Sequence, residues 1–463
     1  MIRIDRQRSA RDLLPKIERL FALSAGKIQS IERTWKPEDG APVFTVKGRY
    51  QARGWTEWTQ GFQFGSALLQ FDATGENEFL DLGRSRTLRR MAPHLTHMGV
   101  HDHGFNNVST YGNLWRLGRE GRLRACDWEI HFYELALKVS AAVQARRWTP
   151  LPDGGFIHSF NGAHSLFVDT MRSLRALALG HLLGQRLMEE QDAAVSLLDR
   201  LVQHASATAR YNIYYGTGRD RFDVRGRTAH ESLFNVANGT YRGPSTQQGY
   251  SPFTTWTRGL AWAMLGFAEQ LEFIQALPDA ALATCGGRAA VEPFLLEAAR
   301  ATCDRYLDIA AADGVPYWDA GAPGLAALEG WGDRPADPFN DREPVDSSAA
   351  AIGAQGLLRL ARIEGRSRGD GSRFEQAGLR VLDTLFDDAG PYLSTDPDHQ
   401  GLLLHSVYHW PNAWDYVPPG ASTPRGESSQ WGDYHAREAA LYVKRLAENA
   451  PYLAFFGAPP IKG

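Results

Sequence analysis

The chain has 463 residues, with 50 Lys and Arg against 53 Asp and Glu, and its formal net charge at pH 7 is −3. A hydrophobic content of 43% and a charged content of 22% are those of an ordinary globular protein, and no basic run stands out that would indicate a nucleic-acid partner. The sequence shows no apolar run long enough for a membrane span, no apolar signal core near its start and only three scattered cysteines, so we expect no membrane association and a reducing, cytoplasmic location.

Apolar residues spaced three and four apart predict helices along most of the chain. One strand-like alternation occurs, at 44–53. In chain order, helices are expected at 11–35, 55–75 (ended by Gly75), 76–91, the later part of 97–118, 127–146, 167–187, 192–209, 255–274, 291–311, 347–363, 373–386 and 434–447.

These segments amount to about twelve helices, mostly in pairs joined by short links, with hardly any strand signal. No fixed repeat length is visible, which argues against an ordinary solenoid. The pattern predicts an all-α fold, an (α/α)6 barrel, as one domain over residues 1–463. Its longest irregular parts, 320–344 and 395–432, are rich in Trp, Asp, Pro and Gly, and long ordered loops of this kind are often functional.

The stretch 247–262, QQGYSPFTTWTRGLAW, gathers groups that suit a sugar acid. Gly249 and Pro252 keep its first part out of a helix, which can begin at the following threonine pair. An aromatic ring suits the apolar face of a sugar, and a guanidinium suits a carboxylate. The alternative is that the tryptophans are core residues and the arginine forms a surface ion pair. The sequence favours sugar-acid binding by an amide, two indoles and a guanidinium: Gln248, Trp256, Trp262 and Arg258.

Two carboxyl groups are candidates for chemistry. Asp102 lies in the turn His101-Asp102-His103, where it could instead cap a helix. A metal site at this turn is disfavoured because alternating side chains rarely converge on one ion, so no metal and no cofactor are predicted. Asp169 opens an otherwise apolar helix, where the helix dipole alone would favour it.

Six motifs in a fixed order carry a resemblance that extends from about Trp58 to Tyr434: WTQGFQFG at 58–65, HDHGF at 101–105, VDTM at 168–171, GY at 249–250 with TWTRGLAW at 255–262, DSSAAAI at 346–352 and WGDY at 431–434. In this combination they resemble glycoside hydrolase family 88, the unsaturated glucuronyl hydrolases. The family fold is an (α/α)6 barrel, in agreement with the helix pattern.

The resemblance implies a hydrolase that releases a 4,5-unsaturated uronic acid from the non-reducing end of lyase-generated oligosaccharides, by protonation and hydration of the C4=C5 enol ether. It places the general acid/base on Asp169 and the second active-site carboxyl on Asp102. The residues around the sugar acid would be Trp58, Phe62, His230, Gln248, Trp256, Arg258 and Trp262. The alternatives are an unsaturated rhamnogalacturonyl hydrolase, a lyase or conventional glycosidase on the same barrel, and a non-catalytic sugar-binding protein. Parent polysaccharide, linkage, sulfation and oligomeric state are left open.

Three residues depart from the family pattern: His103, Leu260 and Arg172. Arg172 stands three residues beyond Asp169, where a cation could hold that carboxyl ionised. We therefore expect Arg172 to bind a second acidic group of the substrate, or Asp102. Asp102 would then be ionised, and Asp169 would carry the proton.

Overall fold

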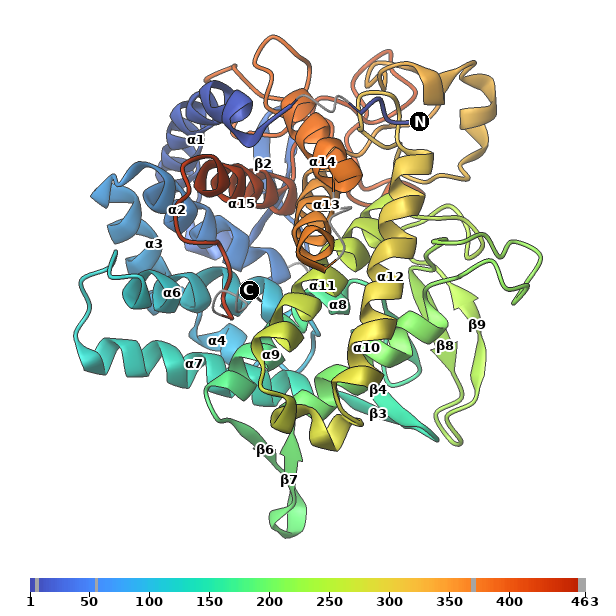
Figure 1. Ribbon diagram of the computed structural model, residues 1–463. Coiled ribbons are helices and arrows are strands. Elements are labelled where there is room, and N and C mark those ends of the chain that lie inside the picture. Colours follow the sequence, from blue (N-terminus) through green and yellow to red (C-terminus); the bar gives the residue numbers. More distant parts are fainter. Residues whose placement is uncertain (5–7, 55–56, 368–371, 457–463) are drawn as a thin grey trace.

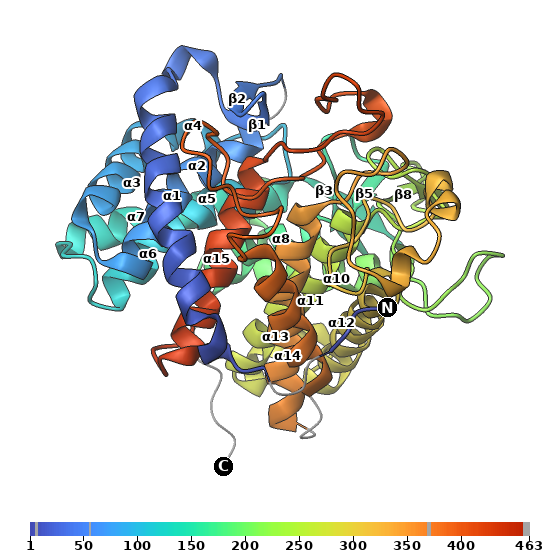
Figure 2. The same cartoon turned by 90° about the horizontal axis from the view of Figure 1, so that it is seen from above.

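A computed structural model describes residues 1–4, 8–54, 57–367 and 372–456. The helices form two concentric rings, and the predicted (α/α)6 barrel is confirmed (Figures 1 and 2). The inner ring consists of α2 (Gln60–Thr74), α5 (His103–Asn107) continued by a π-helical turn (Val108–Gly112) into α6 (Asn113–Arg119), α8 (Thr170–Ser173) with α9 (Arg175–Leu182), α11 (Thr257–Ala276), α13 (Ser347–Ser367) and α15 (Gln430–Ala447). The outer ring consists of α1 (Leu14–Thr34), α3 (Asn77–Arg90), α7 (Asp127–Arg146), α10 (Leu197–Tyr211), α12 (Arg288–Ile309) and α14 (Ser372–Leu385), and the short α4 (Ala92–Leu95) follows α3.

The burial of side chains distinguishes the two rings. In α11 every residue from Thr257 to Ile274 is buried, because inner helices contact neighbours on all sides. In α1 the buried residues form one stripe, with Ile17, Leu20, Phe21 and Ser24 at the spacing of a single helix face. The ring closes where α15 packs against α2. None of the described helices combines the length and the apolar character that a membrane span requires.

Inner helices approach one another backbone to backbone at glycines. A Cβ on Gly104 of α5 would lie 2.2 Å from the carbonyl oxygen of Ser173 in α8. A Cβ on Gly266 of α11 would lie 2.6 Å from the carbonyl carbon of Met171, also in α8. A side chain at either glycine would force the helices apart. The short helix α8 is therefore held between α5 and α11.

The strands form small local sheets outside the rings. The expected strand region at 44–53 is a hairpin of β1 (Pro42–Val46) and β2 (Arg49–Ala52). The hairpin of β3 (Trp148–Leu151) and β4 (Gly154–Ile157) was not predicted, nor was the three-stranded sheet of β5 (Ser165–Phe167), β8 (Glu231–Phe234) and β9 (Tyr241–Ser245).

The predicted helix boundaries at 167, 187 and 192 are wrong. The segment 167–187 begins at the end of β5 and ends in β6 (Arg186–Met188), and α10 starts only after β7 (Ala194–Ser196). β6 and β7 form a hairpin that projects from the body (Figure 1), and Gln191 and Asp192 at its turn adopt positive φ. The apolar residues of this segment lie in two short paired strands joined by a tight turn. A helical spacing of apolar residues does not distinguish this hairpin from a helix.

Candidate active site

A cavity of about 490 Å³ lies at the end of the barrel where the inner helices begin. This volume is in the usual range for small-molecule sites. Its walls are mainly aromatic, with Trp58, Phe105, Trp256, Trp262, Tyr408 and Trp414 among the lining residues. Because helix N-termini carry partial positive charge, the starts of the long helices α2 and α11 at this end favour an anionic ligand.

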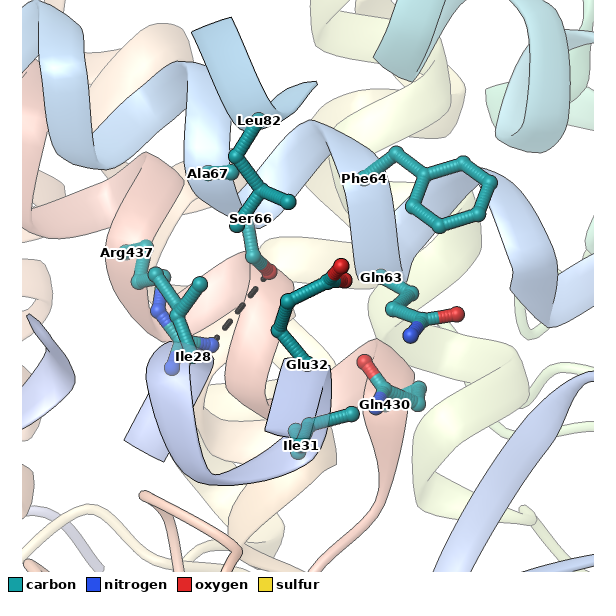
Figure 3. Close-up of a pocket in the computed structure, with 10 residues that line it drawn as sticks. All are labelled: Ile28, Ile31, Glu32, Gln63, Phe64, Ser66, Ala67, Leu82, Gln430 and Arg437. Atoms are coloured by element: carbon teal, nitrogen blue, oxygen red, sulfur yellow. Dashed lines mark hydrogen bonds between the residues drawn. The ribbon is translucent and has the colours of Figure 1, made fainter. Parts of the chain in front are cut away.

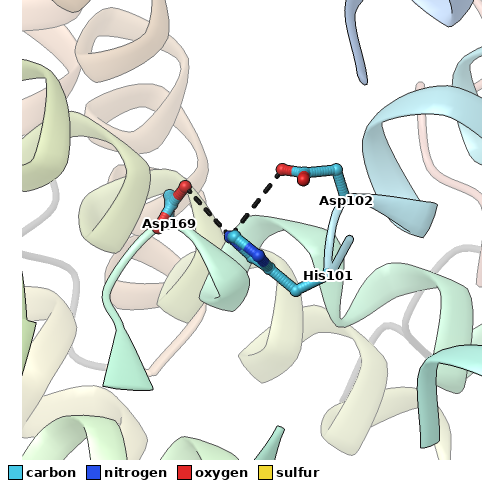
Figure 4. A group of neighbouring side chains, drawn as sticks. All are labelled: His101, Asp102 and Asp169. Atoms are coloured by element: carbon cyan, nitrogen blue, oxygen red, sulfur yellow. Dashed lines mark hydrogen bonds and ion pairs between the residues drawn. The ribbon is translucent and has the colours of Figure 1, made fainter. Parts of the chain in front are cut away.

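His101, Asp102 and Asp169 converge at the cavity wall (Figure 4). The His101 Nε2 atom lies 3.4 Å from Asp169 Oδ2 and 3.8 Å from Asp102 Oδ1. One ring nitrogen of His101 and one carboxylate oxygen from each aspartate all lie within 4.8 Å of one another. The two predicted carboxyl groups therefore meet at one site, with an imidazole between them.

The position of this cluster follows from local hydrogen bonds. Asp169 ends the extended segment after β5 and directly precedes α8. The buried Ser173 hydroxyl, one turn further on, donates to the His101 carbonyl oxygen at 2.7 Å and accepts from the Gly104 N–H at 2.9 Å. Asp102 precedes α5 but makes no side-chain capping bond, so the capping alternative is not supported. One hydroxyl of α8 thus fixes the turn that carries His101 and Asp102.

The three groups of the cluster shift one another's pKa values. Burial raises the pKa of Asp102, and the charge of Asp169 adds to this, against an opposing effect of His101. Burial alone would raise the pKa of Asp169 too, but the hydrogen bond and charge of His101 outweigh it and lower that pKa. Burial opposes protonation of His101, yet the two carboxylates raise its pKa. In the free protein these directions run opposite to the expectation that Asp169 holds the proton while Asp102 is ionised, and that expectation stays a prediction.

Arg258 lines the cavity, and its terminal nitrogens are already engaged. Its Nη1 donates to Asp346 Oδ2 at 3.0 Å and to the Val407 carbonyl. Its Nη2 donates to Gln248 Oε1 at 2.6 Å and to the Tyr408 carbonyl at 2.8 Å. A substrate carboxylate could gain a bond from Arg258 if the side chain of Gln248 moved aside. Asp346 also caps α13, because its Oδ1 accepts from the Ser348 N–H.

Arg172 requires a correction. It is fully buried and forms ion pairs with Glu269 and Glu438, away from the cavity and from both active-site carboxyls. The prediction that Arg172 binds an acidic group of the substrate or Asp102 is therefore wrong. A buried guanidinium is stable only with partners, and two glutamates from α11 and α15 supply them.

Among the other predicted sugar contacts, Trp58, Gln248, Trp256 and Trp262 line the cavity. Phe62 and His230 do not, which corrects those two assignments. Phe62 packs behind Trp58, with ring centroids 6.0 Å apart. His230 Nδ1 accepts from the backbone N–H of Gln247 at 3.1 Å, and burial lowers the pKa of His230 to about 4, so a neutral ring supports the loop.

The sequence did not single out several residues of the cavity. His101 and Phe105 stand in the motif at 101–105, whose spacing does not show that His101 turns toward Asp169. Tyr408 and Trp414 belong to the aromatic-rich loop expected to be functional. Phe160 follows β4 and stacks on His101 at 6.3 Å between ring centroids, and no signal in the sequence marked it.

A second cavity lies between α1, α2 and α15 (Figure 3). Its volume is about 20 Å³, enough for a water molecule. Arg437 donates across it to Ser66 Oγ at 3.3 Å. This cavity is too small for a sugar.

No protein-family profile matches the chain. Comparison with individual proteins does find relatives: the chain is 27% identical over 405 residues to an unsaturated glucuronyl hydrolase of Bacillus sp. strain GL1, covering 84% of this chain and 87% of the relative. It is 23% identical over 417 residues to an unsaturated chondroitin disaccharide hydrolase of Streptococcus pyogenes, covering 87% and 85%. The crystal structure of the unsaturated glucuronyl hydrolase from Bacillus sp. GL1 superposes with a TM-score of 0.70 at 23% identity, over 96% of this chain and 100% of the other. These similarities over most of the chain confirm the predicted resemblance to glycoside hydrolase family 88, the unsaturated glucuronyl hydrolases.

Proposed function

We propose that the protein is a glycoside hydrolase that releases a 4,5-unsaturated uronic acid from the non-reducing end of oligosaccharides made by polysaccharide lyases. The observation that carries this proposal is the His101, Asp102 and Asp169 cluster in the wall of an aromatic cavity that favours an anion. The names of the relatives, which act on unsaturated glucuronyl or unsaturated chondroitin disaccharide substrates, support the substrate class. We also propose that residues 1–463 act as one catalytic domain.

The chemistry requires one group that gives a proton and then takes one. The C4=C5 bond of the substrate forms an enol ether with the ring oxygen, so protonation at C4 leaves an oxocarbenium-like C5. Water adds at C5, its proton leaves to the base, and the hemiketal opens and releases the neighbouring sugar. In the proposal Asp169 donates the first proton and accepts the second.

Binding of the substrate itself would favour a protonated Asp169 in this proposal. A uronate carboxylate brings a negative charge into the cavity and displaces water, and both effects raise the pKa of a nearby carboxyl group. His101 Nε2, between Asp102 and Asp169, is placed to pass a proton to Asp169. Arg258 and Gln248 are the proposed contacts of the uronate carboxylate.

The direct test is incubation with lyase digests of several uronic-acid polysaccharides and with matched saturated oligosaccharides. We expect loss of the double-bond absorbance and release of a sugar only from the unsaturated substrates. Turnover of saturated substrates would identify a conventional glycosidase instead. Preference for unsaturated rhamnogalacturonan fragments would identify that sister activity, and binding without any turnover would identify a sugar-binding protein.

The pH dependence of kcat/KM reports the free enzyme. We expect it to fall as rising pH removes the proton from the cluster. Burial lowers the pKa of His101, and the charge of Asp102 raises it. Asp102→Asn removes that charge, so the pKa of His101 falls and the alkaline limb of the residual activity should move to lower pH. The control is Asp81→Asn on the exposed face of α3. An alkaline limb that stays in place would contradict a proton shared within the cluster.

Arg258→Ala is expected to lower kcat/KM roughly 30-fold, mainly through a higher KM. This corresponds to a loss of about 2 kcal/mol of transition-state stabilisation. The readout specific to the carboxylate is a comparison of the free-acid substrate with its methyl ester. The parent enzyme should prefer the acid, and the variant should lose that preference. Arg242→Ala, an exposed position in β9, is the matched control. An undiminished preference for the acid would mean that Arg258 only holds the loops together.

We expect full activity after dialysis against a chelator, because the proposed steps use only side chains and water. Activity lost in EDTA and restored by one divalent ion would contradict this.

A reducing, cytoplasmic location also stays a prediction, supported by free thiols at all three cysteines.

A further inference from the structure

The cluster of His101, Asp102 and Asp169 has a second property. From the sequence, a metal site at 101–103 is disfavoured because alternating side chains diverge, and the structure agrees for His103, whose ring bonds to Ser140 Oγ and to the His97 carbonyl. The group that converges with His101 and Asp102 is instead Asp169, which directly precedes α8. We propose that these three side chains form an inhibitory site for a divalent transition-metal ion, with Zn²⁺ as the best match. This inference rests on the proposed function for its inhibitory part only.

The geometry fits a four-coordinate ion with one open position. Nitrogen and oxygen ligands at about 2.0–2.2 Å from Zn²⁺ stand about 3.3–3.6 Å apart in a tetrahedron. The distances from His101 Nε2, 3.4 Å to Asp169 and 3.8 Å to Asp102, are close to this spacing. The ligand oxygens of Asp102 and Asp169 lie within 4.8 Å of one another, so rotation of the two side chains would bring them to this spacing. The fourth position would face the cavity, where a water molecule could bind.

Among the described residues, His101 is the only ion-pair partner of either carboxyl group. Asp102 is only 6% exposed, and within the described part of the chain the only ion pair of its side chain is the one with His101. Asp169 Oδ1 is buried and has no hydrogen-bond partner among the described residues. A buried carboxylate oxygen without a donor, such as Asp169 Oδ1, favours a nearby cation. An imidazole with two carboxylates suits Zn²⁺ and Co²⁺ better than Ca²⁺ or Mg²⁺, which prefer oxygen ligands alone.

A bound ion would stop turnover for a direct reason. The metal would take the Asp169 oxygen that must carry the proton, and it would occupy the place where C4 of the sugar approaches that oxygen. The ion and the substrate would therefore exclude one another. Inhibition by Zn²⁺ should be competitive and should be reversed by EDTA.

The binding test needs no substrate, so its failure is distinct from failure of the proposed function. ZnCl₂ is titrated calorimetrically into the full chain, and CoCl₂ is followed by the visible bands of the four-coordinate ion. We expect one ion per chain and those bands. His101→Gln and Asp169→Asn should each weaken binding by at least about tenfold. His131→Gln, an exposed histidine on α7, should leave it unchanged. Circular dichroism checks that each variant is folded.

Three outcomes would overturn the proposal. The first is the absence of binding at millimolar Zn²⁺. The second is binding that persists in both His101→Gln and Asp169→Asn, which would place the ion elsewhere. The third is an ion bound at this cluster while the enzyme turns over its substrate at the full rate, which would contradict the inhibitory role.

Discussion

Asp169→Asn should reduce kcat by about 10²- to 10⁴-fold, because the amide cannot donate the proton to C4 or accept one from water. Asparagine has nearly the same shape, and Asp169 has no ion pair among the described residues other than that with His101, so the fold should persist. The measurement is steady-state turnover of an unsaturated disaccharide, with circular dichroism as the check on folding. Substrate binding should survive, since the aromatic walls are intact.

The control for this variant is Asp81→Asn, an exposed carboxyl on α3 outside the cavity. Normal turnover by Asp169→Asn would contradict the assignment of Asp169 as the general acid/base. Asp102, the other carboxyl of the cluster, would then be the next candidate, and Asp102→Asn tested on the same substrate would decide.

Arg172→Met should lower the free energy of unfolding by about 3–5 kcal/mol. Arg172 has no exposed surface, and its loss would leave Glu269 and Glu438 buried with fewer cations. Burial raises the pKa of Glu438, but Arg172 and Arg175 outweigh it and hold that pKa well below its usual range, which reflects how strongly the cations stabilise its charge. The measurement is urea-induced unfolding followed by tryptophan fluorescence and by circular dichroism.

Two comparisons separate charge from packing in this result. Arg146→Met removes an arginine whose side chain is 60% exposed and 3.6 Å from Glu189, so it should cost under about 1 kcal/mol. Adding Glu269→Gln to Arg172→Met removes one of the two buried carboxylates that lost a cation. It should recover part of the lost free energy of unfolding. A stability for Arg172→Met equal to that of the parent would show that the ion pairs contribute little.

Strong local patterns made much of the fold predictable. The helix expected at 127–146 is α7, with the same limits, and Gly75 ends α2 in a left-handed conformation, as its type favours. The partners of Arg172 illustrate the opposite case. Glu269 lies 97 residues away along the chain and Glu438 lies 266 residues away, so no local spacing could pair them.

In the candidate site, too, local sequence features were predictable and long-range contacts were not. The family resemblance located Asp102 and Asp169, and the composition of 247–262 indicated the wall formed by Gln248 and Trp256. Which carboxyl holds a proton depends on the 3.4 Å contact of His101 and on burial, and both arise only when α5 meets α8. Residue types can nominate acids, but the environment assigns their roles.

The close contact of Gly104 with Ser173 separates two properties of the site that would otherwise change together. The spacing of the two carboxyl groups is set by backbone contact between inner helices, with the Ser173 hydroxyl bonded to both ends of the turn. The walls of the cavity also include loop residues such as Tyr408 and Trp414. Substitutions in those loops can therefore alter which oligosaccharide is accepted while the machinery for proton transfer keeps its geometry, so that new specificities can be selected without rebuilding the reaction.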